Sequence, residues 1–263
     1  MSTDDQAPFM LRRMRWAMIV FVSMIMARGA QAGPPFVTDD PEIPPLHGWE
    51  INLPVTLEHE TGEDVLEMPL VDINYGLTAN VQLMVEFALL HLRMDEGQSQ
   101  RGLSDTGIGV KWHFLDETPL HPQMAFYPRV TIPTGDSRRG LGEGKPSYVL
   151  PLVAQKSWGP WTAFANLGVV LQNGPEKRHF WFHGLAVVRE IGPRLELGAE
   201  LYGNSPADWD EPSSLGFNVG GAWKVADPLN VLFSAGRTFR AEEATTVYVG
   251  VQLLVGGSGA ALE

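Results

Sequence analysis

Residues 49–60, WEINLPVTLEHE, alternate apolar with polar side chains, and this pattern most constrains the fold. Strict alternation gives a β-strand one apolar and one polar face. Weaker versions recur to the end of the chain, and no helical period intervenes. The apolar faces must therefore meet either a shared protein core or lipid, and the choice between the two decides the class of function.

The N-terminus carries an export signal. Three arginines between residues 12 and 15 precede the apolar run 16–27, and Ala30 and Ala32 supply the small residues of a cleavage site. We predict a signal peptide over residues 1–32, cleaved after Ala32, with translation beginning at Met10 in preference to Met1. No later segment approaches the ~18 consecutive apolar residues of a membrane-spanning helix, which argues against a helical inner-membrane protein.

Charge and cysteine content narrow the possibilities further. The chain has 263 residues, no Cys and a net charge of -12, and its length suits one large all-β domain. Without residues 1–32 it keeps 15 of 19 Lys and Arg and 29 of 31 Asp and Glu, a net charge of -14. This charge excludes nucleic acid as a partner. Because an exported chain without Cys has no disulfides, barrel closure is the expected source of stability.

The chain divides into a lead-in, a barrel and a tail. Residues 33–48 are Pro-rich and show neither the period of a helix nor that of a strand. We interpret them as a periplasmic lead-in that can also enter the barrel mouth. Residues 49–255 are expected to form the barrel and residues 256–263 a C-terminal tail. Twelve strands are predicted near 49–59, 67–77, 81–92, 105–114, 123–133, 147–157, 161–171, 179–189, 195–203, 214–224, 230–239 and 245–255.

The connections between these strands indicate a membrane barrel. Brief turns follow mostly the even-numbered strands, whereas longer polar loops follow several odd-numbered ones, clearest at 93–104, 134–146 and 204–213. This sorting is typical of an antiparallel up-and-down transmembrane β-barrel with both termini in the periplasm. Five tryptophans lie at the strand ends or turns assigned to the periplasmic side, where a membrane interface favours them: Trp49, Trp112, Trp158, Trp161 and Trp223.

Alternation then assigns the faces. The first strand should turn Ile51, Leu53, Val55 and Leu57 to lipid, and the third should do the same with Leu83, Val85, Phe87 and Leu89. The segment 179–189 is apolar on both parities and cannot be oriented. A soluble β-sandwich, the alternative fold, predicts instead that Leu53, Val55, Val85 and Phe87 pack against a second layer.

The lumen-facing candidates for a solute path are charged or phenolic. They are Glu50, Glu58, Asp72, Glu86, Asp105, Lys111, Tyr127, Arg129, Glu196, Glu200, Tyr202 and Lys224. Barrels of ~8 strands are packed and those of ~16 hold a water channel, so twelve strands fit either a gated path or a lumen filled by a charge network. The excess of acids disfavours anionic solutes. Gly107 and Gly109 share the inward parity of Asp105 and Lys111, leaving room for solute or for a neighbouring side chain.

The loop 134–146, TGDSRRGLGEGKP, lacks the order of a phosphate-binding loop. It could fold inward as a constriction or contact lipopolysaccharide, but we expect an ordinary solvated loop. The histidines show no paired spacing for a metal, and no Ser has a defensible His and acid partner. The sequence therefore predicts no metal, no cofactor and no enzymatic activity.

Four stretches carry a family resemblance: TDDP at 38–41, NYGLT at 74–78, GLSDTGIGVKW at 102–112 and IPTGD at 132–136. In this order they resemble the phenol-degradation MetA-pathway family of proposed outer-membrane β-barrel transporters. The resemblance implies a Gram-negative outer-membrane barrel that admits aromatic or other hydrophobic compounds, and it supplies no catalytic residues. The last strand, 245–255, resembles the C-terminal signal read by the barrel-assembly machinery, apart from the tail that follows it.

We therefore predict a channel or uptake protein for small hydrophobic or aromatic compounds, working by passive or gated diffusion through the lumen or a lateral gap. Its expected partners are outer-membrane lipid, lipopolysaccharide, the barrel-assembly machinery and a small-molecule solute. A closed structural or adhesive barrel is the alternative, and a lipid-modifying barrel enzyme is a third reading.

Overall fold

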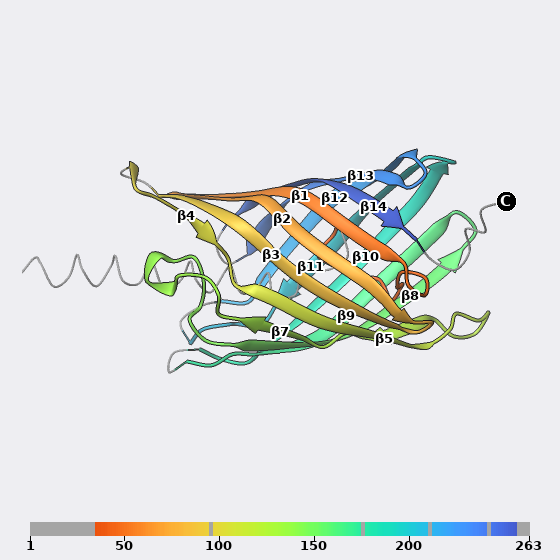
Figure 1. Cartoon of the computed structure of the whole chain (residues 1–263), viewed down its shortest axis with the longest axis horizontal. Helices are drawn as coiled ribbons and strands as arrows, with labels where there is room; N and C mark the ends of the chain where they lie inside the picture. The colour runs from red at the N-terminus through yellow and green to blue at the C-terminus, as the bar shows by residue number, and fades with distance from the viewer. Residues whose placement is uncertain (1–34, 95–96, 175–176, 210–211, 241–242, 257–263) are drawn as a thin grey trace, which may run out of the picture.

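The computed structural model describes residues 35–94, 97–174, 177–209, 212–240 and 243–256, which form a closed antiparallel β-barrel (Figure 1). The predicted signal peptide and residues 257–263 of the tail lie outside the described residues. None of the described residues forms a helix long and apolar enough to cross a membrane. The strands are β1 (Trp49–Glu60), β2 (Glu63–Thr78), β3 (Val81–Met94), β4 (Ser99–Leu103), β5 (Thr106–Leu115), β6 (Gln123–Phe126), β7 (Arg129–Ile132), β8 (Ser147–Trp158), β9 (Trp161–Leu171), β10 (Phe180–Gly192), β11 (Leu195–Asn204), β12 (Ser214–Ala226), β13 (Leu229–Arg240) and β14 (Thr245–Val255).

These fourteen segments make a wall of twelve strands, as predicted. β4 and β5 continue one another along β3, and β6 and β7 continue one another along β8. β1 pairs with β14 from Trp49 opposite Val255 to His59 opposite Thr245, which closes the barrel. Closure pairs the edge that an open sheet would expose, and this is the condition for strands to cross a bilayer.

Several strands are a few residues longer than predicted, β2 for example beginning at Glu63, and two differences are larger. The range 93–104 was expected to be a loop, but β3 continues to Met94 and Ser99–Leu103 forms β4 on the same ladder. Because the β4 sequence, SQRGL, is mostly polar, it shows no clear alternation of apolar and polar residues. The strand predicted at 123–133 is interrupted at Pro128, which has no N–H to donate and whose carbonyl accepts from Val110 N at 3.0 Å.

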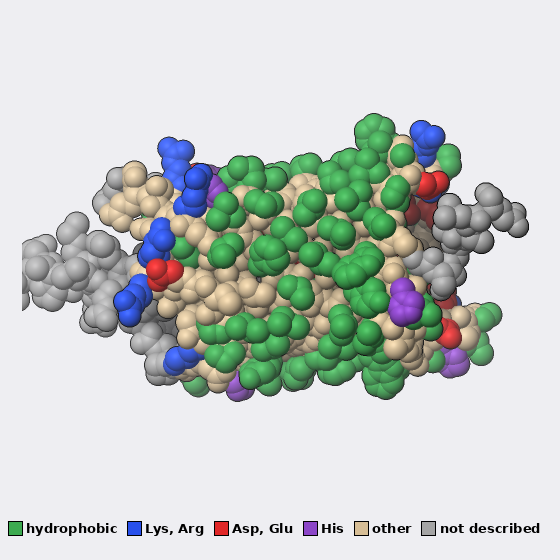
Figure 2. Space-filling model, viewed as in Figure 1, with side chains coloured by type: hydrophobic (Ala, Val, Ile, Leu, Met, Phe, Trp, Pro, Cys, Tyr) green, Lys and Arg blue, Asp and Glu red, His purple; other side chains and the backbone are tan. Residues whose placement is uncertain are grey.

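The outer surface is an apolar band. Leu53, Val55, Val85 and Phe87 are 37–41% exposed and pack under no second layer, so the β-sandwich alternative is wrong. Figure 2 shows apolar side chains covering the middle of the barrel, with charged side chains gathered toward its two ends. An apolar surface this extensive needs a non-aqueous surrounding. The outer surface is therefore built to face lipid.

The two ends of the barrel differ. The turn end carries the short connections after β2, β8, β10 and β12, together with Trp49 and Val255, whereas the loop end carries the connections after β3, β7, β9, β11 and β13. The five tryptophans predicted to lie at the turn end are all exposed on the outer surface. The structure also orients β10, because Phe180 and Phe182 are buried inward while Trp181 between them is exposed.

Candidate solute site in the barrel lumen

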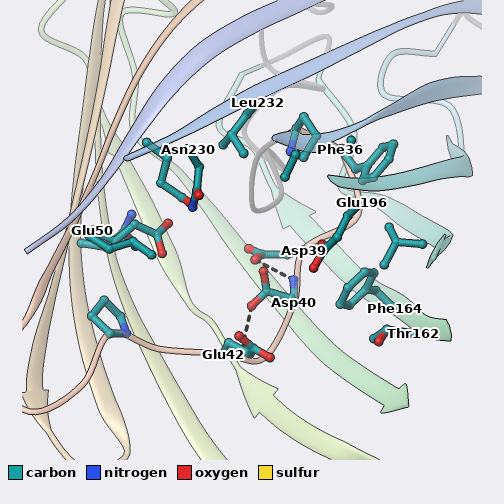
Figure 3. Close-up of a pocket in the computed structure, with 18 of the residues that line it drawn as sticks. Phe36, Asp39, Asp40, Glu42, Glu50, Thr162, Phe164, Glu196, Asn230 and Leu232 are labelled. Carbon is teal, nitrogen blue, oxygen red and sulfur yellow. Dashed lines mark hydrogen bonds between the residues drawn. The ribbon is translucent and has the colours of Figure 1, made fainter. Parts of the chain in front are cut away.

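A cavity of about 890 Å³ lies in the part of the lumen nearer the turn end. At that end its wall includes Pro160, Arg194 and Asp227, and inward it reaches Tyr127 and Arg129. The lead-in supplies part of the lining, and Figure 3 shows Asp39, Asp40 and Glu42 projecting into a space that Glu50 and Glu196 also border. The volume lies within the range of about 300–1,000 Å³ usual for small-molecule sites.

The lead-in is fixed inside the barrel by two charged wall residues. Glu200 Oε1 accepts from Val37 N at 2.7 Å, and its Oε2 accepts from Thr38 N and Thr38 Oγ1 at 2.8 Å each. Lys111 Nζ donates to Asp39 Oδ1 at 3.0 Å and to the Asp40 carbonyl at 2.8 Å. Charge-assisted bonds of this kind are about twice as strong as neutral ones. The segment interpreted as a periplasmic lead-in thus occupies the lumen.

The lead-in leaves the lumen beside Gly76 of β2. His47 N donates to the Gly76 carbonyl at 2.8 Å, and Gly76 N donates to the Gly48 carbonyl at 3.0 Å. A Cβ on Gly76 would lie 2.2 Å from the Pro45 carbonyl oxygen, closer than any real contact. The absent side chain therefore lets the lead-in pass against the wall at this point.

Tyr127 sits between two cations at the inner limit of the cavity. The Lys111 Nζ lies 4.8 Å and the Arg129 Cζ 4.9 Å from the centre of its ring. A Cβ on Gly109 would come within 2.9 Å of both Tyr127 and Arg129. Gly109 thus makes room for a neighbouring side chain, as its inward parity allowed. Cation–π contact holds the stack together.

Carboxylates dominate the cavity. Nine of them line it, namely Asp39, Asp40, Glu42, Glu50, Asp72, Glu86, Glu190, Glu196 and Asp227, against the four cations Lys111, Arg129, Arg194 and Lys224. Amide donors hold some of the acids: Asn52 Nδ2 donates to Glu50 at 2.9 Å and to Asp72 at 3.0 Å. The electrostatic potential of such a lining favours cationic over anionic solutes.

Asp40, on the lead-in, titrates near neutrality. Burial raises the pKa of its carboxyl to about 7, with contributions from neighbouring Asp39 and Glu42, although the Lys111 ammonium lowers it. The charge of the lead-in therefore changes within the pH range in which bacteria live.

The loop 134–146 folds into the loop end of the barrel. Leu141 is 1% exposed and packs with Val65, Leu90 and Leu92 of the inner wall. The Asp105 carboxylate accepts from Gly135 N at 2.9 Å and from Glu143 N at 2.8 Å, which fixes both sides of the loop. The expectation of an ordinary solvated loop was wrong, because a single leucine in a polar, Gly-rich sequence gave little sign of an inward anchor.

Glu143, on this loop, is a second carboxyl whose pKa is raised, as that of Asp40 on the lead-in is. Burial raises the pKa of its carboxyl to about 7, with Asp105 and Asp208 adding to the rise and Lys177 opposing it. The two segments that fill the lumen, the lead-in and the loop 134–146, thus each carry a carboxyl that changes charge near pH 7.

The inner wall toward the loop end is apolar on the β8–β10 side. Val149, Val170, Phe180, Phe182 and Ala207 form one buried cluster there. This part of the barrel interior is therefore packed with apolar and aromatic side chains, whereas the cavity nearer the turn end is polar.

The structure gathers eight of the twelve predicted site residues around the cavity and separates the other four. Glu50, Asp72, Glu86, Lys111, Tyr127, Arg129, Glu196 and Lys224 line it. Lys224 is ion-paired with Asp227 at 2.5 Å. Glu200 binds the lead-in, Asp105 binds the loop 134–146, and Glu58 and Tyr202 lie outside the lining.

Sequence reasoning missed the residues that the lead-in and the loop bring into the lumen. Phe36, Asp39, Asp40 and Glu42 line the cavity, yet they precede the first strand and have no period to place them. The sign of their position was the Pro-rich composition of the segment. A chain that forms no strand or helix hydrogen bonds must be held by contacts with another surface. Within the described residues, no group of three or more His, Asp or Glu side chains is arranged to hold a metal.

Comparison with known proteins agrees with this architecture. Residues 56–253 match the model of the family described as "Putative MetA-pathway of phenol degradation". The chain belongs to this family. No curated protein matches it significantly. Among solved structures, the COG4313 outer membrane channel from Pseudomonas putida F1 is similar, with 13% identity, a TM-score of 0.67 and coverage of 82% of this chain and 98% of that one.

Two further solved barrels share the fold with this member of the phenol-degradation MetA-pathway family. The NanC porin has 5% identity and a TM-score of 0.55, with coverage of 77% of this chain and 98% of that one. The translocator domain of the autotransporter NalP from Neisseria meningitidis has 10% identity and a TM-score of 0.52, covering 79% and 88%. These likenesses establish the fold as that of an outer-membrane β-barrel.

The four stretches that carry the family resemblance lie where the lead-in and the loop 134–146 contact the barrel wall. Asp39 of TDDP binds Lys111 of GLSDTGIGVKW, and Asp105 of that same stretch binds Gly135 of IPTGD. Gly76 of NYGLT borders the lead-in. In this family member, the stretches that carry the resemblance thus include residues that hold these two segments inside the barrel.

Proposed function

We propose that the protein is an outer-membrane passage for small aromatic or otherwise hydrophobic solutes, neutral or cationic, with gated diffusion through its lumen. The cavity of about 890 Å³ inside a closed transmembrane wall carries this proposal. Its carboxylates disfavour anions, and the buried apolar cluster around Phe180 and Phe182 would meet apolar solutes once the gate described below opens. Family membership supports a role in handling phenolic compounds.

In this proposal the loop end faces outward and the turn end faces the periplasm, as in other bacterial barrels with short periplasmic turns. A solute enters at the loop end, passes the apolar cluster and reaches the acidic cavity. The lead-in and the loop 134–146 act as the gate, because both occupy the lumen through side-chain contacts that could be released without unpairing the wall. Nothing in this route requires a catalytic step.

We further propose that the signal peptide is removed after Ala32. The Pro35 carbonyl already lies in the lumen, where Ser234 Oγ donates to it at 2.6 Å. Only Gly33 and Pro34 separate it from the proposed cleavage point. An uncleaved signal peptide would therefore be attached two residues from a position that lies inside the lumen. N-terminal sequencing of the protein from outer membranes should return Gly33 first.

Proteoliposome swelling tests the transport proposal. The two charged probes are phenyltrimethylammonium and benzenesulfonate, aromatic ions of permanent and opposite charge that do not cross bilayers on their own. We expect faster entry of the cation, and a smaller difference when Glu42 and Glu190 of the lining are both replaced by Gln. Phenyl glucoside should enter faster than glucose if the apolar cluster assists aromatic solutes. Permeation no greater than in empty liposomes, for every solute, would leave the closed structural barrel as the better reading.

A further inference from the structure

A row of arginines lies on the outer surface at the loop end. On the paired strands β3 and β4, Leu89 opposite Leu103 is the last apolar outward pair, and the next outward pair is His91 opposite Arg101. Arg93 follows two residues further along β3 and is exposed, as is Arg101. Figure 2 shows Lys and Arg side chains gathered at this end, beyond the apolar band.

The spacing puts these cations at the depth of lipid headgroups. A strand advances about 3.4 Å per residue, so Arg101 lies roughly 7 Å along the strand from the last apolar pair. The headgroup region adds about 5–8 Å on each side of the hydrocarbon core. The guanidinium groups therefore lie where the charged parts of the outer-leaflet lipid begin.

Arg101 is oriented by a described neighbour that carries no negative charge. Arg101 Nε donates to His91 Nδ1 at 3.1 Å, while Arg139 donates through Nε to Gln100 Oε1 and through Nη2 to the Arg101 carbonyl, each at 2.9 Å. Within the described residues, which omit Asp95 and Glu96 of the β3–β4 connection, no ion pair joins Arg93, Arg101 or Arg139 to a carboxylate.

The nearest acids are otherwise engaged. Asp64 is the cross-strand partner of Arg93, but its Oδ1 is bound to His59 Nδ1 at 2.6 Å. Asp136 accepts from the backbone N of Arg138 at 3.1 Å, which caps the short helical turn Ser137–Arg139. A cationic face on a chain of strongly negative net charge calls for an anionic partner.

We propose that Arg93 and Arg101 bind phosphate groups of lipopolysaccharide in the outer leaflet. Guanidinium groups suit this role because their planar donors match phosphate oxygens. Arg139 lies on the inward side of β4, beside Gly102, and its Nη2 donates to the Arg101 carbonyl, so it ties this strand end to the loop 134–146. This role rests on the proposed outward orientation of the loop end, but it does not depend on a solute passing through the lumen.

Native mass spectrometry of the full-length mature barrel in detergent tests the proposal, with bisphosphorylated lipid A and its dephosphorylated form as probes. Removing two arginines near a charged surface should weaken binding roughly 30-fold. We therefore expect this loss for the R93Q/R101Q variant with the phosphorylated probe, and no change with the dephosphorylated one. The matched control, K156Q/R189Q, removes two cations from the turn end and should bind as the unmodified protein does.

Folding is checked in each variant by the heat-dependent gel mobility of closed barrels. Equal affinity of R93Q/R101Q and the unmodified protein for phosphorylated lipid A would overturn the proposal. An equal loss in the turn-end control would also overturn it, because binding would then follow total charge. Solute permeation is measured separately, so failure of lipid binding and failure of transport give different results.

Discussion

Replacing Glu200 by Gln should release the lead-in from the lumen. The carboxylate accepts three hydrogen bonds from Val37 and Thr38, and Asn218 Nδ2 donates a fourth at 2.6 Å. An amide of the same shape keeps one acceptor oxygen and turns an NH₂ group toward donors that already need an acceptor. At least one buried N–H is then left unpaired.

The size of the effect follows from that lost bond. An unsatisfied buried donor costs about 1–3 kcal/mol, so we take about 2 kcal/mol for the weakened attachment of the lead-in. The equilibrium between seated and released lead-in should then shift by roughly 30-fold. The wall strands keep their pairing, and the barrel should still show the gel mobility of a folded protein.

Thiol labelling measures this shift directly. The chain has no Cys, so Phe36→Cys places one thiol at a buried position on the lead-in. The rate of labelling by a membrane-impermeant maleimide should rise by a factor of about 30 when Glu200→Gln is added, since the labelled state is the released one. Glu196→Gln is the matched control, because it lies on the same strand and parity but makes no described bond to the lead-in. An unchanged labelling rate in the Glu200 variant would refute the assigned anchor.

Three further perturbations follow from the same contacts. Leu141→Ala should weaken the packing of the loop 134–146 by about 2–4 kcal/mol and speed its proteolysis. The control Leu120→Ala lies at an exposed turn and should leave the proteolysis rate unchanged. Equal cleavage of the two variants would contradict the inward anchor. Lys111→Met, added to the Phe36→Cys variant, should raise the labelling rate of the Cys at position 36, because Asp39 loses its charged partner. A labelling rate equal to that of Phe36→Cys alone would count against the ion pair. The raised pKa of Asp40, about 7, means that its protonated form favours the seated state. The labelling rate, divided by that of a free thiol at the same pH, should therefore be low below about pH 4 and should increase as pH rises through 7. Asp40→Asn should remove this rise, and a persistent rise would assign it to another group.

The sequence was sufficient to predict the wall but not its contents. Alternation is a local property, so it assigns Leu53 and Val55 to the outside and Asn52 and Thr56 to the lumen, and the burial pattern of β1 agrees. The same rule placed Lys111 and Glu200 inward correctly. It could not say that their partners would be Asp39 and Thr38, because those contacts join residues 72 and 162 positions apart.

The loop 134–146 shows a second limit of sequence reasoning. Its inward position depends on one apolar side chain, Leu141, meeting a pocket formed by three residues of β2 and β3. It also depends on Asp105, whose carboxylate could be assigned to the lumen but not to a pair of backbone N–H groups. Such matches between distant segments leave no periodic trace.

The composition of the lead-in explains how a polypeptide can fill a barrel and still serve as a gate. Buried backbone N–H groups must find acceptors, and a segment lying across a lumen has no ladder to provide them. Four prolines among residues 35–45 remove four of these donors, and the carbonyls of Asp40 and Glu42 are met by the single Lys111 ammonium. Apart from the backbone bonds to Gly76 at its end, the lead-in is thus attached through a few side chains, chiefly Glu200 and Lys111, with single bonds from Ser234 and Gln155. A segment held at so few points can leave as a unit, whereas one paired like a strand would have to break a whole ladder.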